Sequence, residues 1–429
     1  MLKKLTAGAL AALVATLLIL AVFPLHGTRE VHAPRLLGSA GGAGPLLAGA
    51  AERPLAPPPG TPIGGYPRLR YASEGVEDDP MARALVLSGA GLTVALASAD
   101  VLLVPRALRE KVEARLRDLP IDVVLVAATH THAGPGGFWD DALGARFGTG
   151  PYDPAWEDAL ASRVADAIRA AFAARVPSRV ASAGARREDL VVNRDGGPTG
   201  GRLLVVRVER TSGEPLGQVV VFPAHATVHG SRNRLLSGDW PGAMARELPG
   251  VTVFLQGAEG DQTWRLPPGE PGPPHVAFGR LVAGAVRGLS FPPGDAGPPL
   301  AAATAEVSLP SPSFGAVPPF LDRLVSNLLW SWMPDRTRVV ALRIGDVTLL
   351  AVPAEPGALV GSAWREALGP GVEVVSLVGD YVGYVDTAEA VRARSGEARR
   401  TYLGPGLARV LEDGLAAAKR ALPAGRPAP

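Results

Sequence analysis

The 429-residue chain contains no cysteine. Disulfides, thiolate metal ligands, iron–sulfur clusters and cysteine nucleophiles are therefore excluded, and any catalysis has to use histidine, carboxylates, hydroxyls or a metal that they bind. An excess of charge is also lacking, because 43 lysine and arginine residues face 41 acidic residues. Without a cationic surplus to neutralise phosphates, a nucleic-acid partner is not expected.

Apolar residues, in contrast, make up 47% of the chain, which is enough for a large buried core. Short β-rich runs alternate with segments whose apolar residues recur at helical spacing. This alternation predicts an α/β fold with mixed β-sheets flanked by helices, some strands being antiparallel. We interpret one apolar, aromatic segment, residues 320–332, as a buried helix in preference to a lipid-facing lid.

The N-terminus is typical of an export signal. Two lysines precede a long, uncharged and largely apolar run. This pattern predicts a signal peptide or an N-terminal membrane anchor over residues 1–26, and either one places the protein in the periplasm or outside the cell. Residues 27–60 are rich in alanine, glycine and proline and have no apolar period, which predicts a tether. The globular domain is then expected over residues 61–429.

Chemically versatile residues concentrate in two histidine pairs. His130 and His132 follow one apolar β-run, and His225 and His229 follow another. Side chains at the carboxyl ends of neighbouring strands converge on one crevice, so the two pairs favour a shared metal or catalytic site. A single histidine after a strand is usually structural, but four of the seven histidines of the chain belong to these pairs.

Three further predicted strands end in polar side chains. Asp261 and Thr263 follow the run VTVFLQG, Glu355 follows VTLLAVPA, and Tyr381 and Tyr384 follow VEVVSLVG. Each has a structural explanation when taken alone, such as helix capping for a carboxylate or core packing for a tyrosine. Together they strengthen the prediction of a polar crevice.

These segments resemble the motifs of a known family, the neutral (non-lysosomal) ceramidases and their shorter bacterial relatives. The matching segments occur in family order and are THTHAGPGG, FPAHATVHGSRNRLLSGDWPG, FLQGAEGDQT, VPAEPG and YVGYVDTAEA. The resemblance extends from about residue 61 to the C-terminus and implies the family's catalytic domain, in α-β-β-α layers, without its C-terminal immunoglobulin-like domain.

The resemblance also implies one zinc ion. Its implied ligands are His130, His225, Glu355 and Tyr384. Of the remaining residues, His132 is expected to hold the substrate near the metal, and Arg194 and Tyr381 to bind the substrate. The resemblance does not settle the role of His229, for which we expect a structural contribution.

The activity that this implies is hydrolysis of the amide bond of an N-acylated, lipid-like substrate, which for ceramide gives a sphingoid base and a fatty acid. A zinc-activated water is expected to attack the carbonyl. We expect His132 or Asp261 to carry the proton to the leaving amine, and Tyr384 to stabilise the oxyanion. Thr263 stands where the family has a serine and is expected to position the carbonyl or the water.

Two alternatives are left open by the sequence. One is a zinc hydrolase of the same fold that acts on a different amide, ester or phosphate substrate. The other is an envelope binding protein that binds the ligand without turnover. The expected partners are the lipid-like substrate and, through the N-terminal segment, a membrane, and no protein partner is evident from the sequence.

Overall fold

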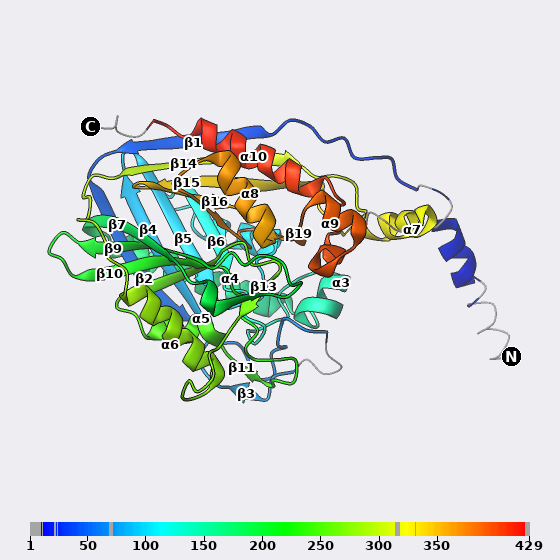
Figure 1. Cartoon of the computed structure of the whole chain (residues 1–429), viewed down its shortest axis with the longest axis horizontal. Helices are drawn as coiled ribbons and strands as arrows, with labels where there is room; N and C mark the ends of the chain where they lie inside the picture. The colour runs from blue at the N-terminus through cyan, green and yellow to red at the C-terminus, as the bar shows by residue number, and fades with distance from the viewer. Residues whose placement is uncertain are drawn as a thin grey trace.

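Figure 1 shows a computed structural model of the chain. It describes residues 10, 12–20, 23, 25–67, 72–313, 318–330 and 332–424. The first nine residues of the predicted leader, with its lysine pair, lie outside the described residues. Within the described ranges, we find no helix with the length and apolarity that a membrane crossing requires.

The larger sheet has eight strands in the order β12-β10-β9-β7-β2-β4-β5-β6. In chain order they are β2 (Leu46–Pro54), β4 (Met81–Gly89), β5 (Leu92–Ala99), β6 (Val123–Ala128), β7 (Val176–Arg186), β9 (Arg202–Arg210), β10 (Pro215–Phe222) and β12 (Val251–Gln256). Neighbours are antiparallel except at the two ends of the sheet, where β6 is parallel to β5 and β12 is parallel to β10.

The second sheet has five strands in the order β1-β14-β15-β16-β18. They are β1 (Arg35–Ala43), β14 (Pro299–Ser308), β15 (Arg336–Ile344), β16 (Val347–Ala351) and β18 (Val372–Val375). Side chains of both sheets, such as Leu85 and Leu342, share one buried cluster, so the sheets pack face to face. Short two-stranded ladders complete the strands: β3 (Gly75–Val76) with β11 (Leu235–Leu236), β8 (Val191–Asn193) with β13 (Gln262–Trp264), and β17 (Glu355–Pro356) with β19 (Tyr384–Val385).

Helices cover the outer faces of both sheets (Figure 1). On the larger sheet lie α2 (Arg106–Arg115), α4 (Pro154–Ala173), α5 (Asp239–Arg246) and α6 (Pro274–Arg287), and on the smaller sheet lie α8 (Ala358–Leu368) and α10 (Leu407–Ala421). Further α-helices are α3 (Ala142–Gly144), α7 (Pro319–Leu329) and α9 (Ala388–Ala393). The expected α/β fold with α-β-β-α layers is confirmed.

The predicted tether over residues 27–60 is wrong from Arg35 onward. β1 pairs with β14 along an edge of the five-stranded sheet, and β2 lies inside the larger sheet between β7 and β4. Small residues in these strands serve close packing. At Gly49, a side-chain methyl would come within 2.1 Å of the carbonyl oxygen of Ala171 in α4. Alanine and glycine therefore mark tight contacts in this segment, although the same composition is typical of linkers.

The helix predicted over residues 320–332 is present as α7, but the prediction that it is buried is wrong. α7 lies at the surface, where Phe320 and Leu328 are 53% and 52% exposed. It projects from the body beside the N-terminal segment (Figure 1). Asn327 donates hydrogen bonds to the carbonyls of Leu20 and Phe23, so α7 contacts the described part of the leader directly.

The carboxyl ends of three strands of the larger sheet meet at one point. Gln256, the last residue of β12, donates hydrogen bonds from Nε2 to the carbonyl of Thr129, just after β6, and to that of Ala224, just after β10. The segments that follow β6 and β10 begin here, and they contain the two histidine pairs.

Candidate metal centre

His130 follows β6 in a conformation that few side chains adopt, with φ of +63°. Its Nδ1 lies 2.7 Å from the carbonyl oxygen of Leu102. Because a carbonyl only accepts, Nδ1 carries the proton and Nε2 presents its lone pair to the site. Nε2 has no hydrogen-bond partner among the described residues and lies 3.2 Å from Oε2 of Glu355.

His225 follows β10 and is oriented in the same way. Its Nδ1 lies 2.9 Å from the carbonyl oxygens of both Glu259 and Gln262, which fixes the proton on Nδ1. Nε2 then faces Oε2 of Glu355, the hydroxyl of Tyr384 and the guanidinium of Arg194, each at 3.3 Å.

Glu355 and Tyr384 come from the short ladder β17–β19, in which they are paired directly. Glu355 is 1% exposed, and its Oε2 is the atom that both imidazoles face. The structure therefore brings together all four residues that the resemblance implied as ligands.

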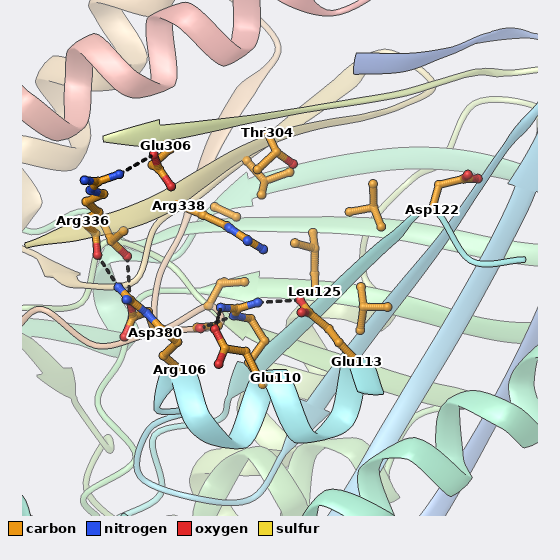
Figure 2. Close-up of a pocket in the computed structure, with 18 of the residues that line it drawn as sticks. Arg106, Glu110, Glu113, Asp122, Leu125, Thr304, Glu306, Arg336, Arg338 and Asp380 are labelled. Atoms are coloured by element: carbon orange, nitrogen blue, oxygen red, sulfur yellow. Dashed lines mark hydrogen bonds and ion pairs between the residues drawn. The ribbon is translucent and has the colours of Figure 1, made fainter. Parts of the chain in front are cut away.

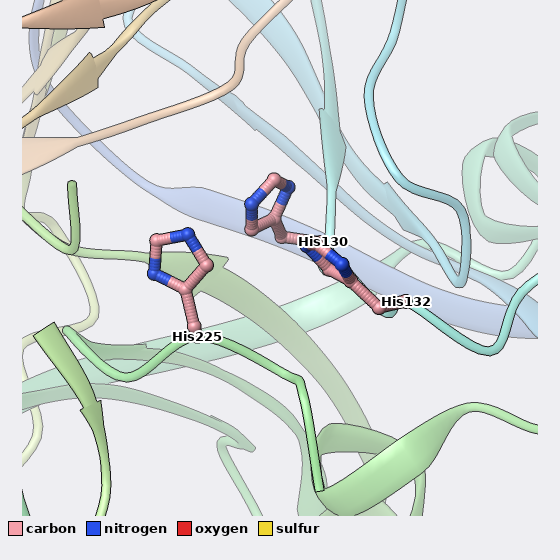
Figure 3. Close-up of side chains that lie close together, drawn as sticks. All are labelled: His130, His132 and His225. Carbon is pink, nitrogen blue, oxygen red and sulfur yellow. The ribbon is translucent and has the colours of Figure 1, made fainter. Parts of the chain in front are cut away.

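His132 lies beside these residues and completes a group of three imidazoles. In Figure 3 the rings of His130, His132 and His225 gather at one place, and one ligand atom from each lies within 4.8 Å of the others. Neither ring nitrogen of His132 has a hydrogen-bond partner among the described residues. His132 is thus free to bind an ion or a substrate.

His130, His132, Glu355 and Tyr384 form the polar end of a cavity of about 490 Å³. The two predicted substrate-binding residues, Arg194 and Tyr381, line it. Tyr381 donates a hydrogen bond of 2.6 Å to Oε1 of Glu355, and Arg194 lies 3.3 Å from Nε2 of His225. The wall is largely aromatic and apolar and is formed by Tyr66, Leu102, Leu103, Trp139, Leu143, Trp332 and Tyr402.

The fold of the chain is shared with solved structures. In fold, the chain is similar to the crystal structure of neutral ceramidase from Pseudomonas aeruginosa, with a TM-score of 0.74 and 21% identity over 90% of this chain and 76% of that chain. It is equally similar to a ceramidase complexed with C2, with a TM-score of 0.75 and 19% identity over 90% of this chain and 77% of that one. The chain has the neutral ceramidase fold.

Sequence comparison points the same way, and the resemblance predicted from the motifs is confirmed. The chain is 28% identical to Neutral ceramidase A of Dictyostelium discoideum over 169 residues, which cover 33% of this chain. It spans about a quarter of that relative's length, since the match covers 24% of it. No family model matches the sequence.

Two predicted catalytic residues of the ceramidase-like site do not line its cavity as the structure describes it. Asp261 accepts hydrogen bonds from Nδ2 of Asn193 at 2.7 Å and from the backbone N–H of Ala358, at the start of α8, at 2.8 Å. Both carboxylate oxygens are therefore engaged in holding the chain, which corrects the expectation that Asp261 carries a proton. The hydroxyl of Thr263 reaches that of Thr227, a cavity residue, at 3.3 Å.

The electrostatics of the cluster favour a bound cation. Burial and the nearby Arg194 lower the pKa of His225 to about 3, and burial and His130 hold the pKa of His132 well below its ordinary value. Burial alone would raise the pKa of Glu355, but the two imidazoles facing it outweigh burial and hold that pKa well below its usual range. At neutral pH the site therefore offers neutral imidazoles at His132 and His225 and an ionised carboxylate at Glu355.

This donor set fits a divalent ion such as zinc. It consists of nitrogen and oxygen ligands without a thiolate. Two of the donor atoms, Nε2 of His130 and Oε2 of Glu355, are buried without a hydrogen-bond partner among the described residues. Buried polar atoms are rarely left in this state, and an ion between them would satisfy both.

Sequence reasoning missed several residues of the site. Trp139 stands only two residues beyond the first histidine motif, so its place in the cavity could have been inferred. Arg400 and Tyr402 come from a segment after α9 that contains no motif, and no local signal predicts them. Glu259, one of the polar residues that follow β12, is fully buried, and burial and the charge of Glu355 raise the pKa of its carboxyl well above its ordinary value, which favours the neutral acid.

A second cavity, of about 230 Å³, lies between α2 and the smaller sheet (Figure 2). Its charged side chains are mostly paired with one another. Arg106 contacts Asp380 at 2.9 Å, and Arg109 contacts Glu113 at 2.7 Å. Because most of these charged groups already pair with one another, we assign no ligand to this cavity.

Proposed function

We propose that this chain is a zinc-dependent hydrolase that cleaves the amide bond of an N-acylated, lipid-like substrate of the ceramide class. The observation that supports it most is the convergence of two imidazoles, a carboxylate and a phenol at the polar end of an aromatic cavity. Such a site combines metal donors with an apolar wall that suits an acyl chain. The likeness to a ceramidase complexed with C2 agrees with this substrate class.

One zinc ion would be held by His130, His225, Glu355 and Tyr384. When bound, it would polarise the substrate carbonyl and lower the pKa of a water molecule. The protein's part is to fix the ligands. Leu102 orients His130 through its carbonyl, Glu259 and Gln262 do the same for His225, and Tyr381 fixes Glu355.

The other polar groups of the cavity can act on the substrate. His132 is the one imidazole of the three that no described hydrogen bond orients, so it can accept a proton and pass it to the leaving amine. Burial and the charge of Glu355 raise the pKa of Tyr384 well above its ordinary value. Tyr384 therefore keeps its proton, and its hydroxyl can donate to the oxygen that gains charge. Arg194 offers its guanidinium to polar groups of the substrate.

We further propose that the protein is exported and meets its substrate at a membrane. The described leader residues 12–20 are helical, and large apolar side chains such as Leu13 and Leu18 are 55% and 60% exposed. α7 contacts this segment and exposes Phe320. Trp332, just after α7, lines the cavity, so an apolar surface that suits lipid adjoins the site.

Hydrolysis of N-acylsphingosine by the purified chain, with and without a chelator, tests the proposed activity. We expect turnover that the chelator abolishes and zinc restores. His130→Ala should lower the bound zinc by one ion per chain and reduce hydrolysis to background, whereas His32→Ala, at an exposed position, should change neither. Cleavage of only simple esters or N-acyl amino acids would show a different substrate, and bound zinc without any hydrolysis would show a binding protein.

A further inference from the structure

A second group of potential metal ligands lies outside the catalytic cluster. It consists of Glu77 just after β3, His229 in the segment between β10 and β11, and His275 in the first turn of α6. One ligand atom from each lies within 4.8 Å of the others. Nε2 of His229 is 2.7 Å from Oε2 of Glu77, and Nε2 of His275 is 3.9 Å from Oε1 of the same carboxylate.

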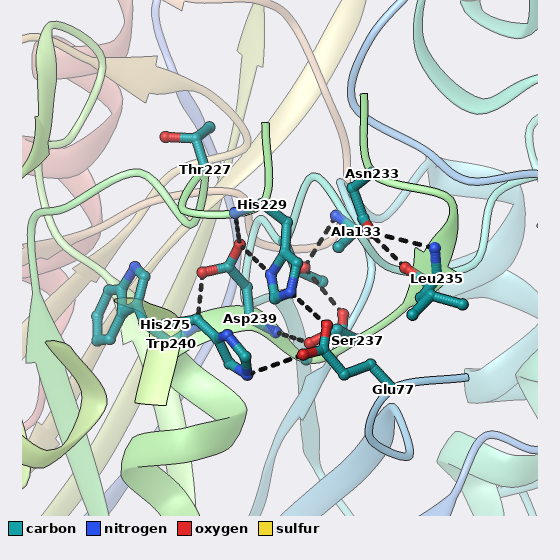
Figure 4. A network of polar contacts seen from close by, with 12 residues as sticks. Glu77, Ala133, Thr227, His229, Asn233, Leu235, Ser237, Asp239, Trp240 and His275 are labelled. Atoms are coloured by element: carbon teal, nitrogen blue, oxygen red, sulfur yellow. Dashed lines mark hydrogen bonds and ion pairs between the residues drawn. The ribbon is translucent and has the colours of Figure 1, made fainter. Parts of the chain in front are cut away.

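A buried carboxylate orients His229 toward this group. Asp239, which is 0% exposed, accepts a hydrogen bond of 2.9 Å from the backbone N–H of His229 and lies 3.2 Å from its Nδ1 through the same oxygen. Figure 4 shows His229 between Asp239 and Glu77, with His275 beside them. Metal-binding histidines typically have such a carboxylate on the nitrogen that does not bind the ion.

The charges around the group favour a cation. Three carboxylates, those of Glu77, Asp78 and Asp239, lie within 4 Å of the two imidazoles. Among the described residues, a single arginine pairs with one of these carboxylates: Arg246 lies 3.3 Å from Asp78. Burial lowers the pKa of His229, but Asp239 and Glu77 outweigh burial and raise this pKa to about 9. A divalent ion at Nε2 would displace that proton and balance the remaining two negative charges. His275 and His229 are mostly buried, whereas the Glu77 side chain is 35% exposed and gives an ion access from solvent.

We propose that Glu77, His229 and His275 bind a second divalent transition-metal ion, with zinc as the best match to two imidazoles and a carboxylate. Asp78, whose Oδ2 is 3.8 Å from Nε2 of His275, is the nearest further oxygen ligand. This ion has a structural role. It fastens the segment after β10, which also contains His225, to β3 and α6.

The connection between the two sites is direct. The segment that contains His229 continues to Ser237, whose backbone N–H donates a hydrogen bond of 3.0 Å to the carbonyl of Ala133, next to His132. An ion at the second site therefore stabilises both histidine segments of the catalytic cluster without touching the cavity.

Zinc stoichiometry of the full chain, by elemental analysis after dialysis and by titration calorimetry, tests this site. We expect two ions in the wild type and one in His275→Gln. In a His130→Ala/His225→Ala variant, which lacks the catalytic ligands, one ion should also remain, and adding His275→Gln should remove it. His32→Gln, at an exposed histidine elsewhere, is the matched control and should keep both ions.

Zinc binding to that double variant is measured without hydrolysis. A failure of the second-site proposal can therefore be distinguished from a failure of the proposed activity. Glu77→Gln removes the more exposed ligand and serves as the second variant if His275→Gln does not fold, as judged by circular dichroism. One ion in the wild type, or an ion that persists in the double variant after His275→Gln and after Glu77→Gln, would overturn the proposal.

Discussion

A methyl group at Gly49 should destabilise the protein markedly. Gly49 lies in β2, opposite Val86 of β4 and under the end of α4. The Cβ of an alanine would lie 2.1 Å from the carbonyl oxygen of Ala171 and 2.8 Å from the backbone nitrogen of Arg175. Both are backbone atoms, so no side-chain rotation can relieve the clash and the helix has to move. Overpacking costs about 1–3 kcal/mol, and we expect Gly49→Ala to reach about 3 kcal/mol because its contacts are this short.

Urea unfolding followed by circular dichroism measures this loss. Gly38→Ala is the matched control, since Gly38 also lies in a strand of the same N-terminal stretch and no described atom comes within 4 Å of its added methyl. We expect it to change the unfolding free energy by less than about 0.5 kcal/mol, as is usual for open surface sites. If the two variants unfold alike, β2 does not lie under α4, and the tether inferred from composition is right.

Three further predictions concern the cluster itself. Tyr381→Phe removes the hydrogen bond to Glu355 and should cost about 10–100-fold in zinc affinity or turnover, so wild-type values in both assays would contradict its positioning role. His132→Gln should keep the zinc content and lower kcat by about 100-fold or more, whereas loss of zinc would make it a ligand. Glu259→Gln should stabilise the protein increasingly as pH rises, by up to about 1.4 kcal/mol per pH unit above the unfolded pKa, because only the unfolded chain ionises Glu259 there. Unfolding curves at pH 5 and pH 8 that show an equal effect would refute it.

The candidate metal centre was largely predictable because its histidines follow strands with strong apolar patterns. The sequences of β6 and β10 clearly predict buried strands, and the carboxyl ends of such strands tend to converge. Glu355 and Tyr384 are different. Each belongs to a two-residue strand, which has no measurable period, so only the resemblance of their motifs placed them in the site.

The errors have a common physical origin. A composition rich in alanine and glycine is shared by tethers and by strands under a close helix, and only the contact between β2 and α4 distinguishes the two. Likewise, Glu77 and His275 are separated by almost 200 residues and have no pattern of their own. His275 stands in a proline-rich stretch of sequence, and the structure shows it in the first turn of a helix.

His225 and His229 are only four residues apart in the sequence, yet they belong to different clusters and have different environments. His225 is held from outside its own segment, by the carbonyls of Glu259 and Gln262 on Nδ1, and its own carbonyl accepts a hydrogen bond of 3.3 Å from Trp240. His229 is held instead by the carboxylate of Asp239, the first residue of α5, and contacts Glu77 outside the cavity. The orientation of the His225 imidazole therefore depends on the β12–β13 connection, and the position of its backbone depends on the segment that also contains His229. Precision at a metal ligand requires both, since a fixed ring on a loose segment would still misplace the donor atom.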